Sequence, residues 1–185
     1  MFRTVQKYND KGLKCLPVGA DKSPFNVNTW KGGILTESSY KECFGIGIIC
    51  GKDSDNLECI DFDNHFGTAK EVLTEFIELV KPIYDKYPLV IEQSMSGGYH
   101  LLYRCDKIEG NQKLARKPVW DEKKHKWVSD ILIETRGEGG YFVCDPTPKY
   151  KVVRNDILNI PHILPEDRDE LIETCKQFNE WIDPI

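Results

Sequence analysis

The 185-residue sequence predicts a mixed α/β (α+β) fold in which strands outnumber helices. Short apolar runs rich in Ile, Val, Leu and aromatic residues recur along the chain, each bounded by glycine, proline or small polar residues. Segments with the apolar spacing of a helix are fewer and lie between and after these runs. Because no internal repeat or low-complexity linker interrupts the pattern, we expect one large domain or two small subdomains.

The predicted strands, in chain order, cover residues 13–18, 46–50, 57–62, 89–93, 99–104, 131–136 and 141–144. The predicted helices cover residues 36–44, 68–81 and 166–181. Residues 68–71 form a capping-box pattern at the start of the second helix. The last helix carries an apolar stripe of the kind that packs on a core, made of Leu171, Cys175, Phe178 and Ile182.

Composition argues against a membrane protein and against a disulfide scaffold. No apolar stretch is long enough to span a bilayer, and residues 1–5 lack the apolar core of a signal peptide. We therefore predict a cytoplasmic protein with no membrane partner. The seven cysteines are an odd number without Cys-x-x-Cys spacing, which favours buried free thiols over a disulfide or zinc framework.

Charge is distributed unevenly although the formal net charge is −5. Residues 104–128 carry eight Lys or Arg against four Asp or Glu, whereas residues 155–185 carry two against eight. The basic segment also holds Trp120 and Trp127, which could stack on nucleic-acid bases. The alternative is a solvated excursion between two strands.

Two carboxylates follow each other on one face of an apolar strand. In an extended backbone Asp61 and Asp63 lie roughly 7 Å apart and point the same way, while Ile60 and Phe62 point into the core. Two like charges so close favour a cation between them. Hard oxygen ligands that leave room for water and phosphate suit Mg²⁺ or Mn²⁺.

The segments before this pair predict a hairpin. The β-rich runs 47–51 and 57–60 are separated by the turn formers of residues 52–56, so the carboxylates would lie at the end of the hairpin. The alternative for the acidic pair is a surface Asp-x-Asp near a turn.

A second motif is Ser94-Met95-Ser96-Gly97-Gly98-Tyr99-His100. Gly97 and Gly98 allow the backbone to approach a ligand closely, and free N–H groups with the Ser96 hydroxyl could meet phosphate oxygens. His100 could donate to a polyphosphate while a neighbour holds its other ring nitrogen. The alternative is a glycine turn beside a core histidine.

A third motif spans residues 131–141. Ile131, Ile133 and Thr135 share one strand face, so Glu134 and Arg136 lie side by side on the other, ahead of a glycine-rich bend. Glu134 could complete a triad of carboxylates around a metal, and Arg136 could bind a phosphate or pair with an acid. The alternative is a cross-strand salt bridge.

Together and in this order, the three motifs resemble the bifunctional primase-polymerase (prim-pol) domain of the archaeo-eukaryotic primase superfamily, common in phage and plasmid replication proteins. Residues 51–54, ahead of the acidic pair, look like the start of that family's first motif. Residues 14–18, residues 22–24 and Trp30 are similar to its N-terminal opening. The resemblance covers residues 13–149.

The resemblance implies two apposed modules, one of them similar to an RNA-recognition motif, with the active site in the cleft between them. It implies that Asp61, Asp63 and Glu134 bind two Mg²⁺ or Mn²⁺ ions. The residues expected at the nucleotide are Ser96, Gly97, Gly98, His100 and Arg136, with His100 also counted as catalytic. The family more often has Asp at the position of Glu134, and no second cysteine pair accompanies Cys105 and His125, so we expect no zinc.

The implied activity is that of a template-dependent nucleotidyltransferase, a DNA primase and polymerase that makes and extends primers on single-stranded DNA from dNTPs or NTPs. Residues 1–154 would form the catalytic domain, and residues 155–185 a helical extension that packs on it or leads to a helicase region, in cis or in trans. For a phage or plasmid protein the compartment would be the host cytoplasm. The alternatives are a metal-dependent nuclease and a catalytically weak nucleic-acid-binding replication-initiation module; a triphosphate cradle at residues 96–100 is superfluous in the first.

Overall fold

The computed structural model describes residues 1–25 and 35–184, and Trp30 lies outside them. Within the described residues, the fold is α+β, with two antiparallel sheets and four α-helices. The small sheet has the strand order β1-β2-β8, with β1 (Cys15–Val18), β2 (Gly45–Ile49) and β8 (Tyr141–Cys144). The large sheet has the order β6-β7-β3-β5-β4-β9, with β3 (Leu57–Phe62), β4 (Val90–Gln93), β5 (Tyr99–Arg104), β6 (Lys113–Asp121), β7 (Lys126–Arg136) and β9 (Lys151–Arg154).

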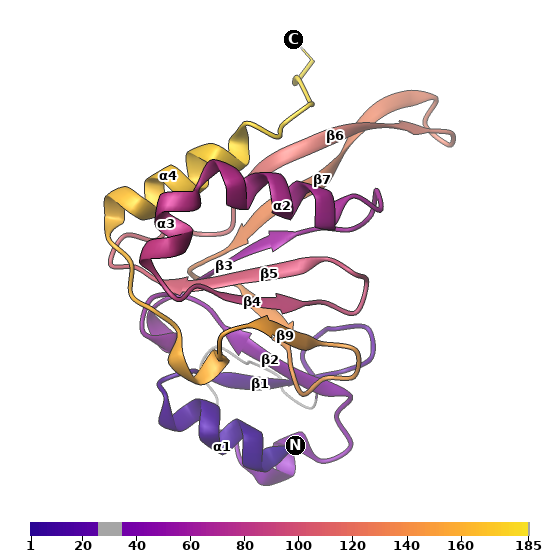
Figure 1. The fold of residues 1–185 in the computed structure, drawn as a ribbon. Helices are drawn as coiled ribbons and strands as arrows, with labels where there is room; N and C mark the ends of the chain where they lie inside the picture. Colours follow the sequence, from indigo (N-terminus) through magenta and orange to yellow (C-terminus); the bar gives the residue numbers. More distant parts are fainter. Residues whose placement is uncertain (26–34, 185) are drawn as a thin grey trace.

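The helices form outer layers. α2 (Ala69–Leu79), α3 (Lys81–Lys86) and α4 (Pro165–Lys176) cover one face of the large sheet, and α1 (Phe2–Asp10) lies beside the small sheet (Figure 1). Short 3₁₀ turns complete the chain: η1 (Glu37–Tyr40), η2 (Lys52–Ser54) and η3 (Ile157–Asn159). None of the described helices is long and apolar enough to cross a membrane.

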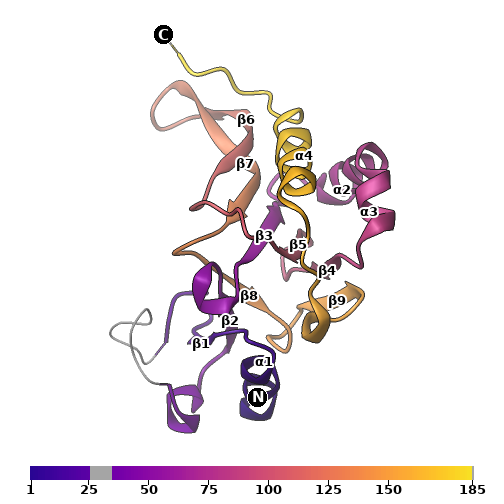
Figure 2. The same ribbon diagram turned by 90° about the vertical axis from the view of Figure 1, so that its left-hand side faces the viewer.

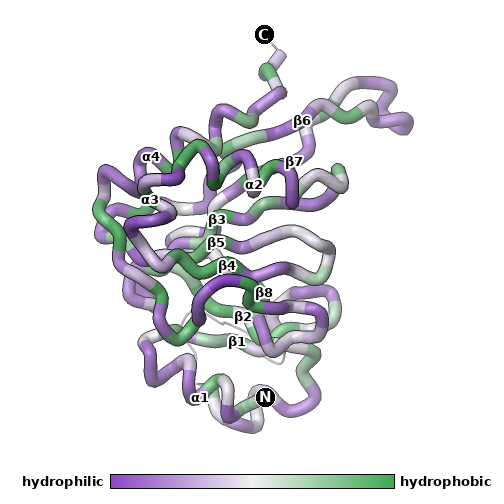
Figure 3. Tube along the Cα trace, in the orientation of Figure 1, coloured by the Kyte–Doolittle hydropathy of each residue, from purple (hydrophilic) through white to green (hydrophobic). Residues whose placement is uncertain are grey.

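Alternation along β3 creates two hydrophobic cores. Ile60 and Phe62 point to the helix layer and pack with Phe76 of α2 and Leu171 of α4. Cys59 points to the other face and packs among residues of the small sheet. Hydrophobic residues accordingly concentrate along the strands between these layers (Figure 3). Polar side chains on the same face of β3 as Cys59 therefore lie between the two sheets.

Most predicted strands are confirmed. β3, β5 and β8 have the predicted bounds, and β1, β2, β4 and the inner part of β7 lie within one or two residues of theirs. All seven cysteines are free, and six are buried, with Cys43 partly buried. Burial of short apolar runs is a local property of sequence, so these predictions needed no knowledge of the strand partners.

The predicted hairpin of residues 47–60 is wrong. β2 pairs with β1 and β8, whereas β3 pairs with β5 and β7 in the other sheet. Only an isolated bridge between Gly51 and Leu57 joins the two runs. The turn at residues 52–56 therefore carries the chain from one sheet to the other, and the acidic pair lies at the far end of β3.

Three helix predictions need correction. Residues 36–44 form only the 3₁₀ turn η1, and the helix predicted over 68–81 ends at Leu79, after which Pro82 in the first turn of α3 starts a new helix. Thr68 makes no capping hydrogen bond, and its buried hydroxyl has no partner among the described residues. The Asn64 side chain instead accepts the Ala69 N–H at 3.1 Å.

The last helix ends earlier than predicted, at Lys176, and Ile182 of the predicted stripe is 88% exposed. The sequence patterns missed α1, β9, β6 and the outer half of β7. β6 and outer β7 have few buried residues, so they lack the apolar alternation that marks a strand packed on a core. The basic segment of residues 104–128, for which the alternative prediction was a solvated excursion between two strands, holds β6 and the start of β7, which pair as a hairpin.

Candidate active site

Strand register brings four polar residues into one row across the large sheet. Asp61 of β3 lies opposite Glu134 of β7 on one side and His100 of β5 on the other. His100 in turn lies opposite Glu92 of β4. Directly opposed residues in antiparallel strands have their Cβ atoms about 4.5–5.5 Å apart. Residues far apart in sequence therefore become neighbours on the face that packs on the small sheet.

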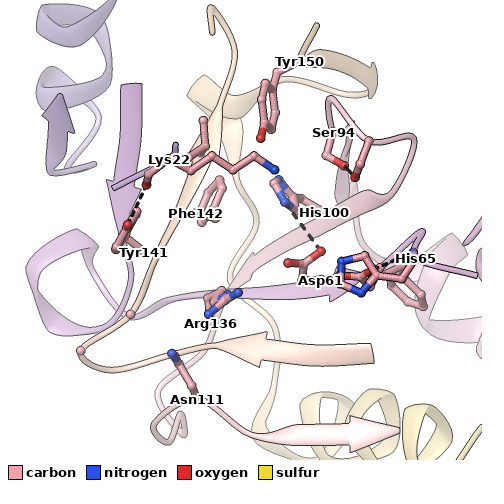
Figure 4. Close-up of a pocket in the computed structure, with 16 residues that line it drawn as sticks. Lys22, Asp61, His65, Ser94, His100, Asn111, Arg136, Tyr141, Phe142 and Tyr150 are labelled. Carbon is pink, nitrogen blue, oxygen red and sulfur yellow. Dashed lines mark hydrogen bonds and ion pairs between the residues drawn. The ribbon is translucent and has the colours of Figure 1, made fainter. Parts of the chain in front are cut away.

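A cavity of about 370 Å³ opens beside this row, lined by residues of both sheets (Figure 4). Five of the predicted site residues line it: Asp61, Asp63, Ser96, His100 and Arg136. Glu134, Gly97 and Gly98 are not among the lining residues. Gly139 and Gly140, in the bend after β7, are.

Asp63 lies one residue beyond β3, where its N–H donates to the Leu132 carbonyl at 2.9 Å. Its Oδ1 accepts the His65 N–H at 2.8 Å and lies 3.2 Å from His65 Nδ1. Burial raises the pKa of Asp63, and the charges of Asp61 and Asp130 add to this, against a lowering by His65. The carboxylate therefore lies in an environment of converging negative charge.

Glu134 is turned along its own strand toward Arg136, whose Nη2 lies 2.5 Å from Oε1. Burial raises the pKa of Glu134, and the charges of Asp61 and Asp63 add to it, although Arg136 lowers it. As they stand, no three His, Cys, Asp or Glu side chains of residues 1–25 and 35–184 form a group that could hold a metal ion. In the structure, the Glu134 carboxylate is therefore paired with the Arg136 guanidinium.

The donor chemistry of these acids nevertheless fits a hard divalent cation. Asp61 of β3, Asp63 just beyond it and Glu134 of the adjacent β7 supply carboxylate oxygens, and for Asp63 and Glu134 burial and then neighbouring acids raise the pKa. These three side chains carry the donor atoms that Mg²⁺ or Mn²⁺ prefers, but among the described residues they do not lie as one group ready to hold the ion.

His100 is buried and held by Glu92. Its Nδ1 lies 3.0 Å from Glu92 Oε1, and its Nε2 lies 3.8 Å from Asp61 Oδ1. The other Glu92 oxygen accepts the Asp145 N–H at 2.7 Å. Burial disfavours the imidazolium, but the Glu92 hydrogen bond and the Asp61 charge outweigh it and raise the pKa of His100. The ring also packs edge-on against Phe142.

Gly97 and Gly98 shape the tip of the β4–β5 hairpin. Gly97 has φ +87°, and a Cβ on Gly98 would lie 2.5 Å from the Phe62 carbonyl oxygen. The tip is fastened there because the Asn64 amide donates to the Ser96 carbonyl at 2.9 Å. The two glycines thus let the hairpin approach the end of β3, where the acidic pair lies.

Sequence patterns missed Glu92 and Lys22. Glu92 sits inside an apolar strand and carries no motif. Lys22 has a left-handed backbone with φ +67°, and its carbonyl accepts the Tyr141 hydroxyl at 2.7 Å. Its side chain extends across the cavity toward His100 (Figure 4). The only sequence signal for Lys22 was that residues 22–24 resemble the N-terminal part of the prim-pol domain.

Comparison with protein families supports the resemblance of the motifs. The family model of the N-terminal domain of bifunctional DNA primase/polymerase, Prim-Pol, matches residues 5–167. A comparison with curated proteins found no match. The matched span contains both sheets, the row of polar residues and the cavity. The chain therefore belongs to the Prim-Pol family of bifunctional DNA primases and polymerases.

Proposed function

We propose that the chain is a template-dependent nucleotidyltransferase that synthesises and extends primers on single-stranded DNA by two-metal phosphoryl transfer from dNTPs or NTPs. The observation that carries the proposal is the row of Glu134, Asp61 and His100 on three adjacent strands, with Asp63 beside it at the cavity. Family membership associates the chain with primase and polymerase activity in general.

In this proposal Asp61, Asp63 and Glu134 would hold Mg²⁺ or Mn²⁺. Bound there, the cations would activate a primer 3′-hydroxyl and neutralise charge on the leaving pyrophosphate. What the chain itself supplies is positioning and fixed charge.

The proposed phosphate contacts come from side chains that lie beside the acids. His100, oriented by Glu92, presents Nε2 to the nucleotide phosphates, and the Ser96 hydroxyl adds a donor. Arg136 and Lys22 are the Lys and Arg residues among the described lining side chains. An anionic triphosphate would therefore find cationic side chains next to the acids that would hold the metal ions.

The experiment that tests the proposal measures incorporation of labelled dNTPs and NTPs on single-stranded DNA, with Mg²⁺ or Mn²⁺, with and without an annealed primer. Product without a primer, lost in the Asp61→Ala, Asp63→Ala double variant, is the expected result. Degradation of the DNA instead of synthesis would support a nuclease. DNA binding with no product in any condition would support a binding module.

Saturating Mn²⁺ is expected to raise the melting temperature of the chain, because Asp61 and Asp63 repel each other without a cation. A ligand at 100 times its Kd stabilises by about 2.7 kcal/mol, or roughly 5–10 °C for a chain of this size. Calorimetry with Mn²⁺ against EDTA measures the shift. An unchanged melting temperature, or an equal shift in the double variant, would contradict the assigned site.

Lys22→Ala is expected to raise the nucleotide KM roughly tenfold, the lower range for losing a charged hydrogen bond, with little change in kcat. Steady-state incorporation with varied dNTP measures this. Lys70→Ala, at an exposed position of α2, is the matched control and should behave as wild type. An unchanged KM in Lys22→Ala would remove Lys22 from the nucleotide site.

A further inference from the structure

The β6–β7 hairpin extends beyond the rest of the large sheet. β3 pairs with β7 only from Ile133 to Arg136, so the outer part of β7 has β6 as its one strand partner among the described residues. In both views this two-stranded ribbon projects past the other strands (Figures 1 and 2). An isolated two-stranded ribbon buries little surface and contributes little to the core.

Two tryptophans lie near the tip of the ribbon. Trp120 and Trp127 are directly opposed, with ring centroids 5.6 Å apart at 73°, and are 41% and 60% exposed. The edge-to-face contact stabilises the ribbon but leaves ring surface open to solvent. Of the large apolar side chains exposed in the described part of the chain, these two are the aromatic ones.

The tip also has a small excess of positive charge on a protein of formal net charge −5, because residues 120–127 hold three lysines against Asp121 and Glu122. At the base of the ribbon, Arg116 and Lys117 are paired with Asp183 and Glu180 of the segment after α4. Toward the tip, the ammonium groups of Lys123 and Lys126 have no carboxylate oxygen of a described residue within 4.0 Å. Exposed rings together with free ammonium groups match a polyanion whose flat bases are unpaired, which is single-stranded nucleic acid.

The ribbon leads directly to the candidate active site. β7 carries Trp127 at its outer end and Arg136 at the cavity, and Asp130 between them contacts the cavity residue His65 at 3.3 Å. Seven residues of strand from Trp127 to Glu134 span roughly 23 Å, the length of about seven stacked nucleotides. A strand held in the cavity could therefore reach the tip.

We propose that the outer β6–β7 ribbon is a binding arm for the single-stranded template. Trp120 and Trp127 stack on unpaired bases, and Lys123 and Lys126 bind the neighbouring phosphates. The template assignment rests on the proposed function, whereas the binding of single strands does not.

The test is fluorescence anisotropy of a labelled oligothymidylate with the full chain, without nucleotide or divalent cation. Trp127→Ala should weaken binding about 5- to 150-fold, the effect of losing one stacked base. Trp127→Phe keeps an aromatic face and should retain most of the affinity. Leu79→Ala removes an exposed apolar side chain from α2 and should bind as wild type.

A second measurement addresses charge. Lys123→Ala together with Lys126→Ala should lower the slope of log affinity against log salt by about 1.4, because each phosphate contact on a single strand contributes about 0.7. Wild-type affinity in Trp127→Ala, or equal losses in Trp127→Phe and Trp127→Ala, would overturn the stacking arm even if the chain synthesises primers. Trp127-dependent binding in a chain that synthesises nothing would support the arm and reject the proposed function.

Discussion

Asp61→Asn is expected to abolish nucleotide incorporation while the fold stays intact. Asp61 is the central member of the row, opposite both Glu134 and His100. Asparagine has nearly the same size but removes the negative charge that would hold a divalent cation. Loss of even an indirect metal contact costs 10- to 100-fold, so we expect at least about a 100-fold loss of rate.

The measurement is primer extension with Mn²⁺, together with melting temperature in EDTA. Removing the Asp61 charge ends its repulsion with Asp63, so the melting temperature in EDTA should stay the same or rise. The increase in melting temperature caused by Mn²⁺ should disappear. Asp85→Asn, which breaks an exposed pair with Lys81 on α3, is the matched control and should extend primers normally. Wild-type extension by Asp61→Asn would refute its assignment as a metal-binding residue.

Arg168→Met is expected to destabilise the chain strongly. Arg168 of α4 is 2% exposed and donates to both carboxylate oxygens of the fully buried Glu58 at 2.9 Å. Glu58 also accepts the Tyr103 hydroxyl. Removing the guanidinium leaves a buried carboxylate without its cation, which costs about 3–5 kcal/mol. For a chain of this length the melting temperature should fall by roughly 6–20 °C.

Thermal or denaturant unfolding tests this, with two controls. Lys107→Met breaks an exposed pair with Asp169 of the same helix and should change the melting temperature little. Glu58→Leu with Arg168→Met removes both charges and should recover much of the loss. If Arg168→Met melted like Lys107→Met, the ion pair would not be what fastens α4, and with it the segment after residue 154, to the large sheet.

Local sequence determined the strands that pack on a core and the face that each of their side chains occupies. β3 has the predicted bounds, and Ile60 and Phe62 are buried on the helix side, because alternation along an extended backbone depends only on neighbouring residues. For the same reason Glu134 and Arg136 share the face predicted for them. The order of three short motifs was enough to indicate the family to which the chain belongs.

Long-range pairing was outside the reach of these patterns. The turn at residues 52–56 has the composition of a hairpin turn, yet the strands on its two sides bury their apolar residues in different sheets. Only the competition among all strands for partners decides such a choice. The sequence patterns missed the outer β6–β7 ribbon because its strands are exposed on both faces. Such strands need no apolar alternation.

By itself, then, the sequence determined which residues are the candidates for the proposed chemistry: the acidic pair, His100, Glu134 and Arg136. Tertiary structure decided which of them are neighbours, because the register of β7, β3, β5 and β4 sets one row across the sheet. It also brought in Glu92, which is opposed to His100 across the β4–β5 hairpin, and Lys22, which reaches the cavity from a distant segment. The place of Lys22 is created by packing the two sheets together, and no short stretch of sequence encodes it.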